Sequence, residues 1–353
     1  MTRRPPITYA RSQDGVTLAV TASGTGPVLV EAPWVPFSNV RRGWDNPLLR
    51  AFHEELGRRL EVVQYDGRGT GHSQRDVTDL SLDAMVADLE AVVDMAGRGD
   101  RVSLLGQYTA VPHVLAYAAR HPGRVDRIAV FAGAPRGWLA MSAGETQALL
   151  SLMEKDWNLF AESAAHRWMG WAAGEAGQAV ADALRDAVSP HIARATLQAA
   201  SATDVTGEIP AVESATLVLH RTGMSQIPVD VARALAEDLP RGRLSLLPGS
   251  QPALFVDDPT AVARMLADFF RDGIVPDGPA AAPGQSPAAA GGLSRRELEV
   301  LRLVAAGESN GAVARRLGLS LHTVERHLAN IYRKIDARGR ADATAYAVRQ
   351  GLV

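Results

Sequence analysis

The chain has 353 residues, of which 46% are hydrophobic and 22% charged, and its formal net charge is −2 at pH 7. This composition is ordinary for a globular protein, and the length is sufficient for two domains with cores of their own. The absence of cysteine excludes a disulfide framework and thiolate chemistry. No apolar run is long enough to span a membrane and no signal peptide is visible, so we expect a cytoplasmic protein without membrane contact.

The first 131 residues alternate short apolar runs with amphipathic stretches. Asp14-Gly15, between two apolar runs, predicts a tight hairpin. Strands are predicted over residues 7–12, 16–22, 28–30, 60–65, 101–105 and 125–131. Helices are predicted over 47–59 and 82–95, and from the residues after Ala110 to 121. This alternation predicts the α/β class, with a mostly parallel sheet covered by helices on both faces.

Residues 136–206 interrupt the alternation, and we predict that they form several helices. Four of the six tryptophans are found there: Trp138, Trp157, Trp168 and Trp171. The alternation then resumes, with strands predicted over 216–220 and 244–247 and helices over 229–239 and 259–270. Residues 273–292 are mainly Gly, Ala, Pro, Gln and Ser, which predicts a flexible linker after a first domain of residues 1–272.

The last segment, residues 293–353, is predicted to be a separate, all-helical domain. Ser294 and Glu297 have the spacing of a capping box at a helix start, and Ser309 and Ser320 can cap two further helices. The third helix has one apolar stripe: Val324, Leu328, Ile331 and Ile335. Its opposite face carries Thr323, Glu325, Arg326, Ala329, Asn330 and Arg333.

The charge of this segment indicates a DNA-binding domain. It holds eleven Arg and Lys against six Asp and Glu, whereas the rest of the chain has a net charge of −7. A basic module is expected where a domain binds DNA, and a helix that exposes Arg, Asn and a small residue fits the major groove. The alternative is a small helical bundle with a solvated charged face, which this charge asymmetry disfavours.

Residues 293–353 resemble the helix-turn-helix domain of the LuxR family of bacterial transcription regulators. The resemblance runs without a gap from Leu293-Ser294-Arg295-Arg296-Glu297 through Asn330-Ile331-Tyr332-Arg333-Lys334. It implies that the bases of double-stranded DNA are read by Glu325, Arg326 and Ala329. It implies that Thr323, His327 and Lys334 contact phosphates or support the helix, with Asn330 and Arg333 on the same side. It also implies that the last helix, 340–351, pairs two copies in a homodimer.

Residues 7–272 resemble the α/β-hydrolase family. The most specific match is Asp66-Gly67-Arg68-Gly69-Thr70-Gly71-His72-Ser73, which is close to the family's Asp-x-Arg-Gly-x-Gly-x-Ser loop. Residues 136–206 lie where the family has its helical lid. The resemblance implies a structural role for His72 and Ser73, and we predict that His113 and His121 are ordinary helix residues.

The positions that carry catalysis in this family have changed. Its nucleophile lies in Gly-x-Ser-x-Gly between a strand and a helix, and the matching segment here is Gly106-Gln107-Tyr108-Thr109-Ala110. Tyr108 therefore takes the nucleophile position. By the same resemblance, Met224 takes the acid position and Pro252 the base position.

No other residue restores the missing chemistry in the sequence. None of the nine histidines lies between His220 and His322, and Thr109, as a displaced nucleophile, would lack a partner. The oxyanion loop has also changed, because Trp34 takes the position of the amide donor. We therefore predict that the domain has no catalytic residues, cofactor or metal, and does not hydrolyse esters by the usual route.

A hydrolase scaffold without its triad still offers a pocket, which is simplest to interpret as a sensor when a DNA-binding domain follows. All six tryptophans fall in the entry loop or the lid. The predicted ligand is small and largely apolar, and its predicted contacts are Trp34, Tyr108, Thr109, Trp138, Trp168, Met224 and Pro252. Two alternatives are an active hydrolase with non-standard residues and a protein-interaction scaffold with a collapsed cavity. A response regulator controlled by phosphorylation is disfavoured, because a receiver domain would be about half as long.

Overall fold

The computed structural model describes residues 4–34, 36–137, 150–153, 155–169, 174–224, 227–256, 258–275, 295–305, 308–317, 321–334, 337 and 339–349. The chain divides into two compact units. One comprises Met1–Arg221, Gln226–Leu247 and Gln251–Pro279, and the other comprises Thr222–Ser225, Pro248–Ser250 and Ala280–Val353.

The first unit is built on an eight-stranded sheet in the order β1-β2-β4-β3-β5-β6-β7-β8. The hairpin of β1 (Thr8–Arg11) and β2 (Thr17–Gly24) is antiparallel, and β2 pairs antiparallel with β4 (Glu61–Tyr65). The remaining strands run parallel to β4: β3 (Val28–Glu31), β5 (Val102–Gln107), β6 (Val125–Phe131), β7 (Ala215–Arg221) and β8 (Gly242–Leu247). The predicted mostly parallel sheet is confirmed.

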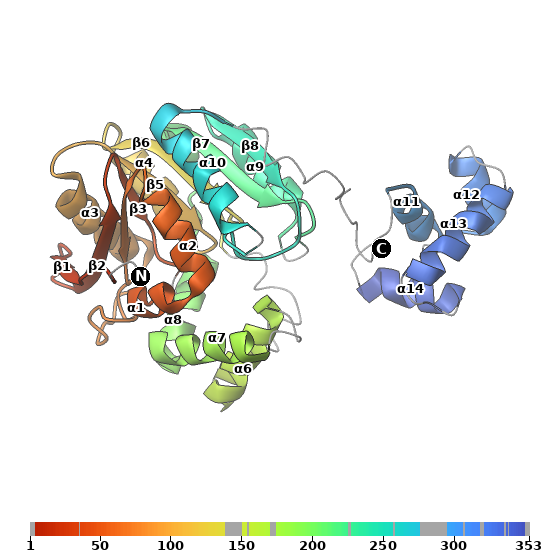
Figure 1. Ribbon diagram of the computed structural model, residues 1–353, viewed down its shortest axis with the longest axis horizontal. Helices are drawn as coiled ribbons and strands as arrows, with labels where there is room; N and C mark the ends of the chain where they lie inside the picture. Colours follow the sequence, from red (N-terminus) through yellow and green to blue (C-terminus); the bar gives the residue numbers. More distant parts are fainter. Residues whose placement is uncertain are drawn as a thin grey trace. The chain divides into compact units, whose positions relative to one another are not determined.

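Helices cover both faces of this sheet (Figure 1). Alternate strand residues such as Val30 and Leu104 share one apolar core with α3 (Leu82–Gly97), α4 (Ala110–Arg120) and α9 (Val229–Asp238). On the other face, α2 (Pro47–Leu56) packs against α10 (Pro259–Asp272). Local chemistry sets the helix ends, because Asn46 caps α2, Ser81 caps α3 and Asp258 caps α10 through their side-chain oxygens.

Between β6 and β7 the chain forms the helices α6 (Trp157–Met169), α7 (Gly174–Ala187) and α8 (Pro190–Ala202), followed by the short 3-10 helix η3 (Ile209–Ala211). The three α-helices have an apolar cluster of their own, in which Phe160, Leu184 and Ile192 are buried. The backbone amide of Gly71 donates to the carbonyl oxygen of Ala187 at 2.7 Å, which ties this cluster to the loop after β4. The predicted helical insertion is therefore present among the residues described.

The second unit contains four helices in its described residues: α11 (Arg295–Ala305), α12 (Asn310–Leu317), α13 (Leu321–Lys334) and α14 (Arg340–Arg349). Their core includes Val300, Val313, Val324, Leu328 and Ile331, all buried. Ser309 caps α12 as predicted, since its hydroxyl accepts a hydrogen bond from the amide of Ala312. The predicted caps Ser294 and Ser320, and the predicted core residue Ile335, lie outside the described residues.

One α-helix was not predicted. Residues Val40–Asp45 form α1, whose first amides are bonded by the side chain of Asn39. The carboxylate of Asp66 also accepts a hydrogen bond from the amide of Val40 at 2.7 Å. Across the described residues, no helix is long and apolar enough to cross a membrane.

Candidate ligand site and candidate DNA-binding surface

Tyr108 sits on a sharp turn between β5 and α4. Its φ angle is +50°, a left-handed conformation that is rare for a residue with a side chain. Small residues make room for the turn, since a Cβ on Gly133 would lie 2.8 Å from the carbonyl oxygen of Tyr108. A non-glycine residue in this region carries about 1–3 kcal/mol of backbone strain. The turn between β5 and α4 is therefore strained, and the residue that bears the strain is a tyrosine.

The Tyr108 side chain is held on three sides and is only 8% exposed. Its ring stacks on that of Trp34, with centroids 5.2 Å apart, and meets the edge of Phe131 at 6.1 Å. Its hydroxyl donates a hydrogen bond to the backbone carbonyl oxygen of Pro252. Burial raises the pKa of the Tyr108 phenol well above its usual range. The phenol is therefore neutral at physiological pH.

Two further predicted site residues have side chains that neither donate nor accept protons. Met224 is buried and carries a thioether, and Pro252 carries a saturated ring. Met224 lies in the loop after β7, where the amide of Gly223 donates to the carbonyl oxygen of Gly249 at 2.9 Å. A hydrolytic acid or base at these two positions would have to be supplied by another residue.

A cavity opens beside Tyr108, with about 20 Å³ of space for the centres of water molecules. Tyr108 and Thr109 line it from the elbow, and its other walls include His113 of α4, Arg136 after β6 and Thr203 after α8. A space of this size holds about one water molecule. Of the predicted ligand contacts, Trp138 and the side chain of Trp168 lie outside the described residues.

His113 lies within helix α4, as predicted, and it also lines this cavity. It is 8% exposed, and burial lowers its pKa from 6.5 to about 4. The imidazole is therefore neutral at pH 7 and offers one donor and one acceptor. His113 follows Thr109 by four residues, a spacing that puts both side chains on one side of a helix. This spacing indicates that His113 lies near the elbow.

A partly buried polar cluster joins the ends of β3 and β5 to α2. Glu31, at the end of β3, binds His53 of α2 at 2.7 Å through Oε2. The same carboxylate accepts hydrogen bonds from the side-chain amides of Gln64 and Gln107, both at 3.0 Å. Gln107 directly precedes Tyr108, and Glu31 lies three residues before Trp34. The cluster thus connects the two strands that carry the stacked aromatic rings.

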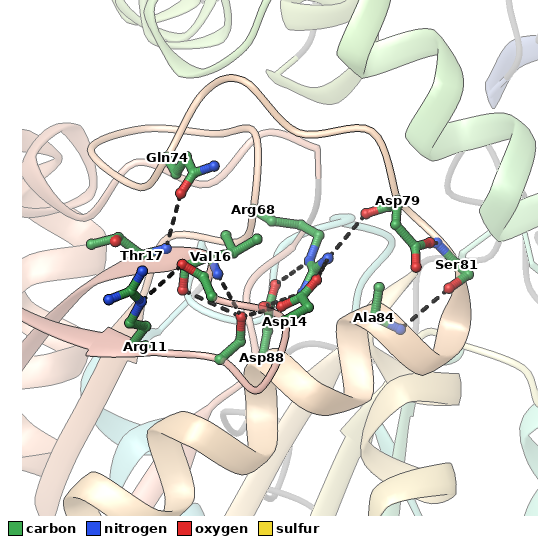
Figure 2. A network of polar contacts seen from close by, with 12 residues as sticks. Arg11, Asp14, Val16, Thr17, Arg68, Gln74, Asp79, Ser81, Ala84 and Asp88 are labelled. Carbon is green, nitrogen blue, oxygen red and sulfur yellow. Dashed lines mark hydrogen bonds and ion pairs between the residues drawn. The ribbon is translucent and has the colours of Figure 1, made fainter.

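The loop after β4 is structural, as the resemblance implied. Arg68 is 1% exposed, and its guanidinium binds Asp88 through Nε and Nη2, at 2.9 and 2.7 Å (Figure 2). Nη1 of Arg68 binds Asp14 at 2.7 Å (Figure 2). The hydroxyl of Ser73 donates to the carbonyl oxygen of Asp66 and accepts from the amide of Ala19. These contacts fix the loop to β2 and α3 and leave Ser73 with a structural role.

In the second unit, α13 has a buried and an open side. Val324, Leu328 and Ile331 lie in the core. Four of the predicted DNA-binding residues are exposed: Glu325, Arg326, Ala329 and Lys334. Three are half-buried: Thr323, His327 and Asn330. The side chain of Arg333 lies outside the described residues. The predicted base-reading residues therefore share the open side of one helix.

Lys334 has a partner within the protein. Its Nζ lies 2.7 Å from Oε2 of Glu297, whose side chain is 6% exposed. This ion pair joins the end of α13 to the start of α11. Of the two roles implied for Lys334, the pair favours support of the helix. Arg340 acts similarly, since Nη2 donates to the carbonyl oxygens of Val304 and Glu308 at 2.9 and 2.6 Å.

Comparison with known proteins assigns the end of the chain. Residues 292–347 match the family described as bacterial regulatory proteins, luxR family. The transcriptional regulatory protein LiaR of Bacillus subtilis is 41% identical over 61 residues, or 17% of this chain and 29% of that protein. The match thus spans less than a third of that regulator's length.

The first unit is similar to hydrolases. A protein named as carbamate hydrolase RutD, from Caulobacter sp., is 26% identical over 223 residues, which cover 62% of this chain and 83% of that protein. An esterase from Exiguobacterium antarcticum superposes with a TM-score of 0.66 at 19% identity, covering 75% of this chain and 99% of that one. An enol-lactonase from Burkholderia xenovorans superposes with a TM-score of 0.61 at 20% identity, covering 74% of this chain and 99% of that one. These likenesses confirm the α/β-hydrolase fold.

Proposed function

We propose that this chain, which joins a LuxR-type DNA-binding domain to a domain of α/β-hydrolase fold, is a transcription regulator that senses a small, largely apolar ligand. In this proposal the hydrolase-fold domain, residues 1–272, binds the ligand without cleaving it. A linker, residues 273–292, connects it to the DNA-binding domain of residues 293–353. One observation carries the proposal: the strained elbow presents Tyr108, whose hydroxyl is bound to Pro252.

The chemistry at the elbow supports a role other than hydrolysis. Acyl transfer needs a nucleophile, a base that removes its proton and an acid that orients the base. Tyr108 is buried and neutral, and its hydrogen bond ends on a backbone carbonyl oxygen, which cannot take up the proton. The ring of Trp34 also covers the face of Tyr108. An acyl group would find neither an activated oxygen nor an open approach.

The same contacts suggest how a ligand could be detected. Ligand pockets typically measure about 300–1,000 Å³, whereas the cavity beside Tyr108 offers about 20 Å³. A ligand must therefore displace Tyr108, Trp34 or part of the lid. Displacing Tyr108 breaks its bond to Pro252 and releases the loop that leads into α10. Such a ligand binds the open state better than the closed one, which is the condition for a population shift.

The DNA-binding part of the proposal rests on α13. Glu325, Arg326 and Ala329 are exposed on the side opposite the core, as direct readout of a major groove requires. We propose that two copies pair through α14 and bind a two-fold related site. Ala343 and Ala347 of α14 are buried against α11, so the pairing would use another side of that helix.

The small cavity favours a second candidate, a scaffold that binds another protein and keeps its pocket closed. The two candidates differ in whether any small molecule enters the site. The DNA affinity of the full-length protein for its own upstream region would be measured by fluorescence anisotropy, with and without lactones, esters and cell extract. The ligand would then be recovered and its mass measured.

The outcomes separate the candidates. A shifted affinity with the compound recovered intact supports the sensor, and a cleaved compound means that the domain is an active hydrolase. If no compound shifts the affinity, the scaffold is favoured. Tyr108→Phe should alter the ligand response because it lacks the hydroxyl that bonds Pro252. Tyr9→Phe is the matched control, since Tyr9 is 60% exposed on β1.

A further inference from the structure

A second cleft lies at the opposite ends of the strands from Tyr108. It has about 460 Å³ of space for water and is bordered by the first residues of β6, β7 and β8 and by the end of α10. Strand register brings these residues together, since Arg127 is opposite Ala215 and Thr216 is opposite Gly242. Three arginines from two strand starts line the cleft: Arg127, Arg241 and Arg243.

Arg127 is held in place at one end of its guanidinium. Its Nη1 binds Oδ2 of Asp126 at 2.6 Å and the carbonyl oxygen of Phe270 at 2.8 Å. The Nε–Nη2 edge has no hydrogen-bond partner among the described residues. A Cβ at Gly273 would lie 3.5 Å from both atoms of this edge. Gly273 ends α10 with φ +71°, a backbone conformation that favours glycine. Because glycine has no side chain, the Nε–Nη2 edge of Arg127 is not covered at this point.

Unlike Arg127, which is paired with Asp126, the other two arginines have no carboxylate partner among the described residues. The Nη1 atom of Arg241 reaches only the carbonyl oxygen of Glu213, at 3.4 Å. Arg243 is exposed, and within the described part of the chain it has neither a hydrogen bond nor an ion pair. No acidic residue is among those that line the cleft. Three guanidinium groups therefore line a concave space, and two of them have no carboxylate partner in the described part of the chain, although the net charge of residues 1–292 is negative.

We propose that this cleft binds a phosphate-bearing small molecule of about nucleotide size. A guanidinium offers parallel N–H donors through its Nε–Nη2 edge, which match two phosphate oxygens. Three such groups suit a phosphate or diphosphate better than a single carboxylate. Phe269 and Val275 supply an apolar wall for the organic part. The volume lies within the range of known small-molecule sites, about 300–1,000 Å³. This site is separate from the one at Tyr108 and does not depend on the ligand proposed there.

The test is isothermal titration calorimetry of the full-length protein with ADP, inorganic pyrophosphate and citrate at constant ionic strength. The variant Arg241→Gln/Arg243→Gln removes two exposed cleft arginines and should weaken ADP binding at least about tenfold. The control Arg233→Gln/Arg264→Gln removes the same charge from α9 and α10, outside the cleft. It should bind ADP like the unaltered protein. Unchanged thermal unfolding would show that both variants fold.

The remaining outcomes are equally informative. Pyrophosphate binding as tightly as ADP would show that the phosphate groups alone are recognised, and tighter binding of ADP would support the apolar wall. The proposal is overturned if ADP does not bind, if citrate binds as tightly, or if both variants lose affinity equally.

Discussion

The hydroxyl of Tyr108 donates a hydrogen bond to the backbone carbonyl oxygen of Pro252, a residue 144 positions further along the chain. In the resemblance to α/β-hydrolases, these two residues stand at the nucleophile and base positions. The bond joins a phenol to the main chain and involves no second side chain. Together with the stacking of Trp34 on the Tyr108 ring, it closes the elbow.

Tyr108→Phe should lower the free energy of unfolding of the hydrolase-fold domain by about 1–2 kcal/mol, because the carbonyl oxygen of Pro252 loses its donor. Urea titration followed by tryptophan fluorescence measures this, since all six tryptophans precede residue 172 and report on this domain alone. Tyr9→Phe, at an exposed position, should change the value by less than about 0.5 kcal/mol. An equal loss in both variants would mean that the bond contributes nothing.

His113→Gln should make the same domain less sensitive to acid. Burial lowers the pKa of His113 from 6.5 to about 4, so between these values the unfolded chain binds more protons than the folded one. The free energy of unfolding therefore falls as the pH drops from 6.5 towards 4, and the contribution of His113 to this loss is about 2 kcal/mol at pH 5. The measurement is the free energy of unfolding at pH 7 and pH 5.

Asp66 acts in the opposite sense, because burial raises its pKa to about 6 and favours the folded state as the pH falls. Asp66 is present in both His113→Gln and the unaltered protein, so its contribution cancels when their free energies of unfolding are subtracted. The exposed His191→Gln, on α8, is the control and should leave the pH dependence as it is. If His113→Gln retains the full acid sensitivity, the imidazole is not buried as described.

Asp88→Asn should destabilise the domain by about 3–5 kcal/mol, because it leaves a buried guanidinium without the carboxylate that binds it twice. Both side chains, Arg68 and Asp88, are 1% exposed (Figure 2). The control is Asp94→Asn, since Asp94 is 56% exposed in its ion pair with Arg124 and should contribute under about 1 kcal/mol. Similar midpoints of thermal unfolding for the two variants would refute the assignment.

Arg326→Ala should weaken DNA binding, whereas Lys334→Ala should lower the stability of the DNA-binding domain. Arg326 is exposed on α13, and its loss should weaken specific DNA binding by about 1–3 kcal/mol without changing the unfolding of the DNA-binding domain. Lys334→Ala leaves the buried Glu297 without its cation and should lower the stability of that domain by about 1–3 kcal/mol. Anisotropy measures the first effect and circular dichroism the second. The exposed Arg302→Ala on α11 is the control for lost charge.

Most of the fold was predictable because periodicity is a local property of the sequence. Predicted and observed strands agree to within about two residues; residues 125–131 are β6. Helix α1 was missed because it is short and partly fixed by Asp66, which is 26 residues from the amide of Val40. The comparisons confirm the LuxR-type resemblance for residues 292–347 and the α/β-hydrolase fold for the first unit.

The candidate sites were only partly predictable. The sequence indicated that Tyr108 and Pro252 occupy key positions, but not that they bond, because the acceptor is a main-chain atom. It indicated neither the position of His113 at the cavity nor the cleft of arginines. Arg127 and Arg241 are far apart in the sequence, and only the strand order β6-β7-β8 brings them to one edge. The ion pair of Lys334 with Glu297 likewise depends on how α11 and α13 pack.

The acceptor for Tyr108 has one consequence for how such a site can evolve. Every amino acid has a backbone carbonyl oxygen, so the hydrogen bond from Tyr108 does not depend on the side chain at residue 252. Substitutions at residue 252 would therefore leave the acceptor in place, whereas substitution of Tyr108 by phenylalanine removes the donor. Other domains with this bond should be recognisable in sequence by a tyrosine at the position of residue 108, whatever residue stands at the position of Pro252.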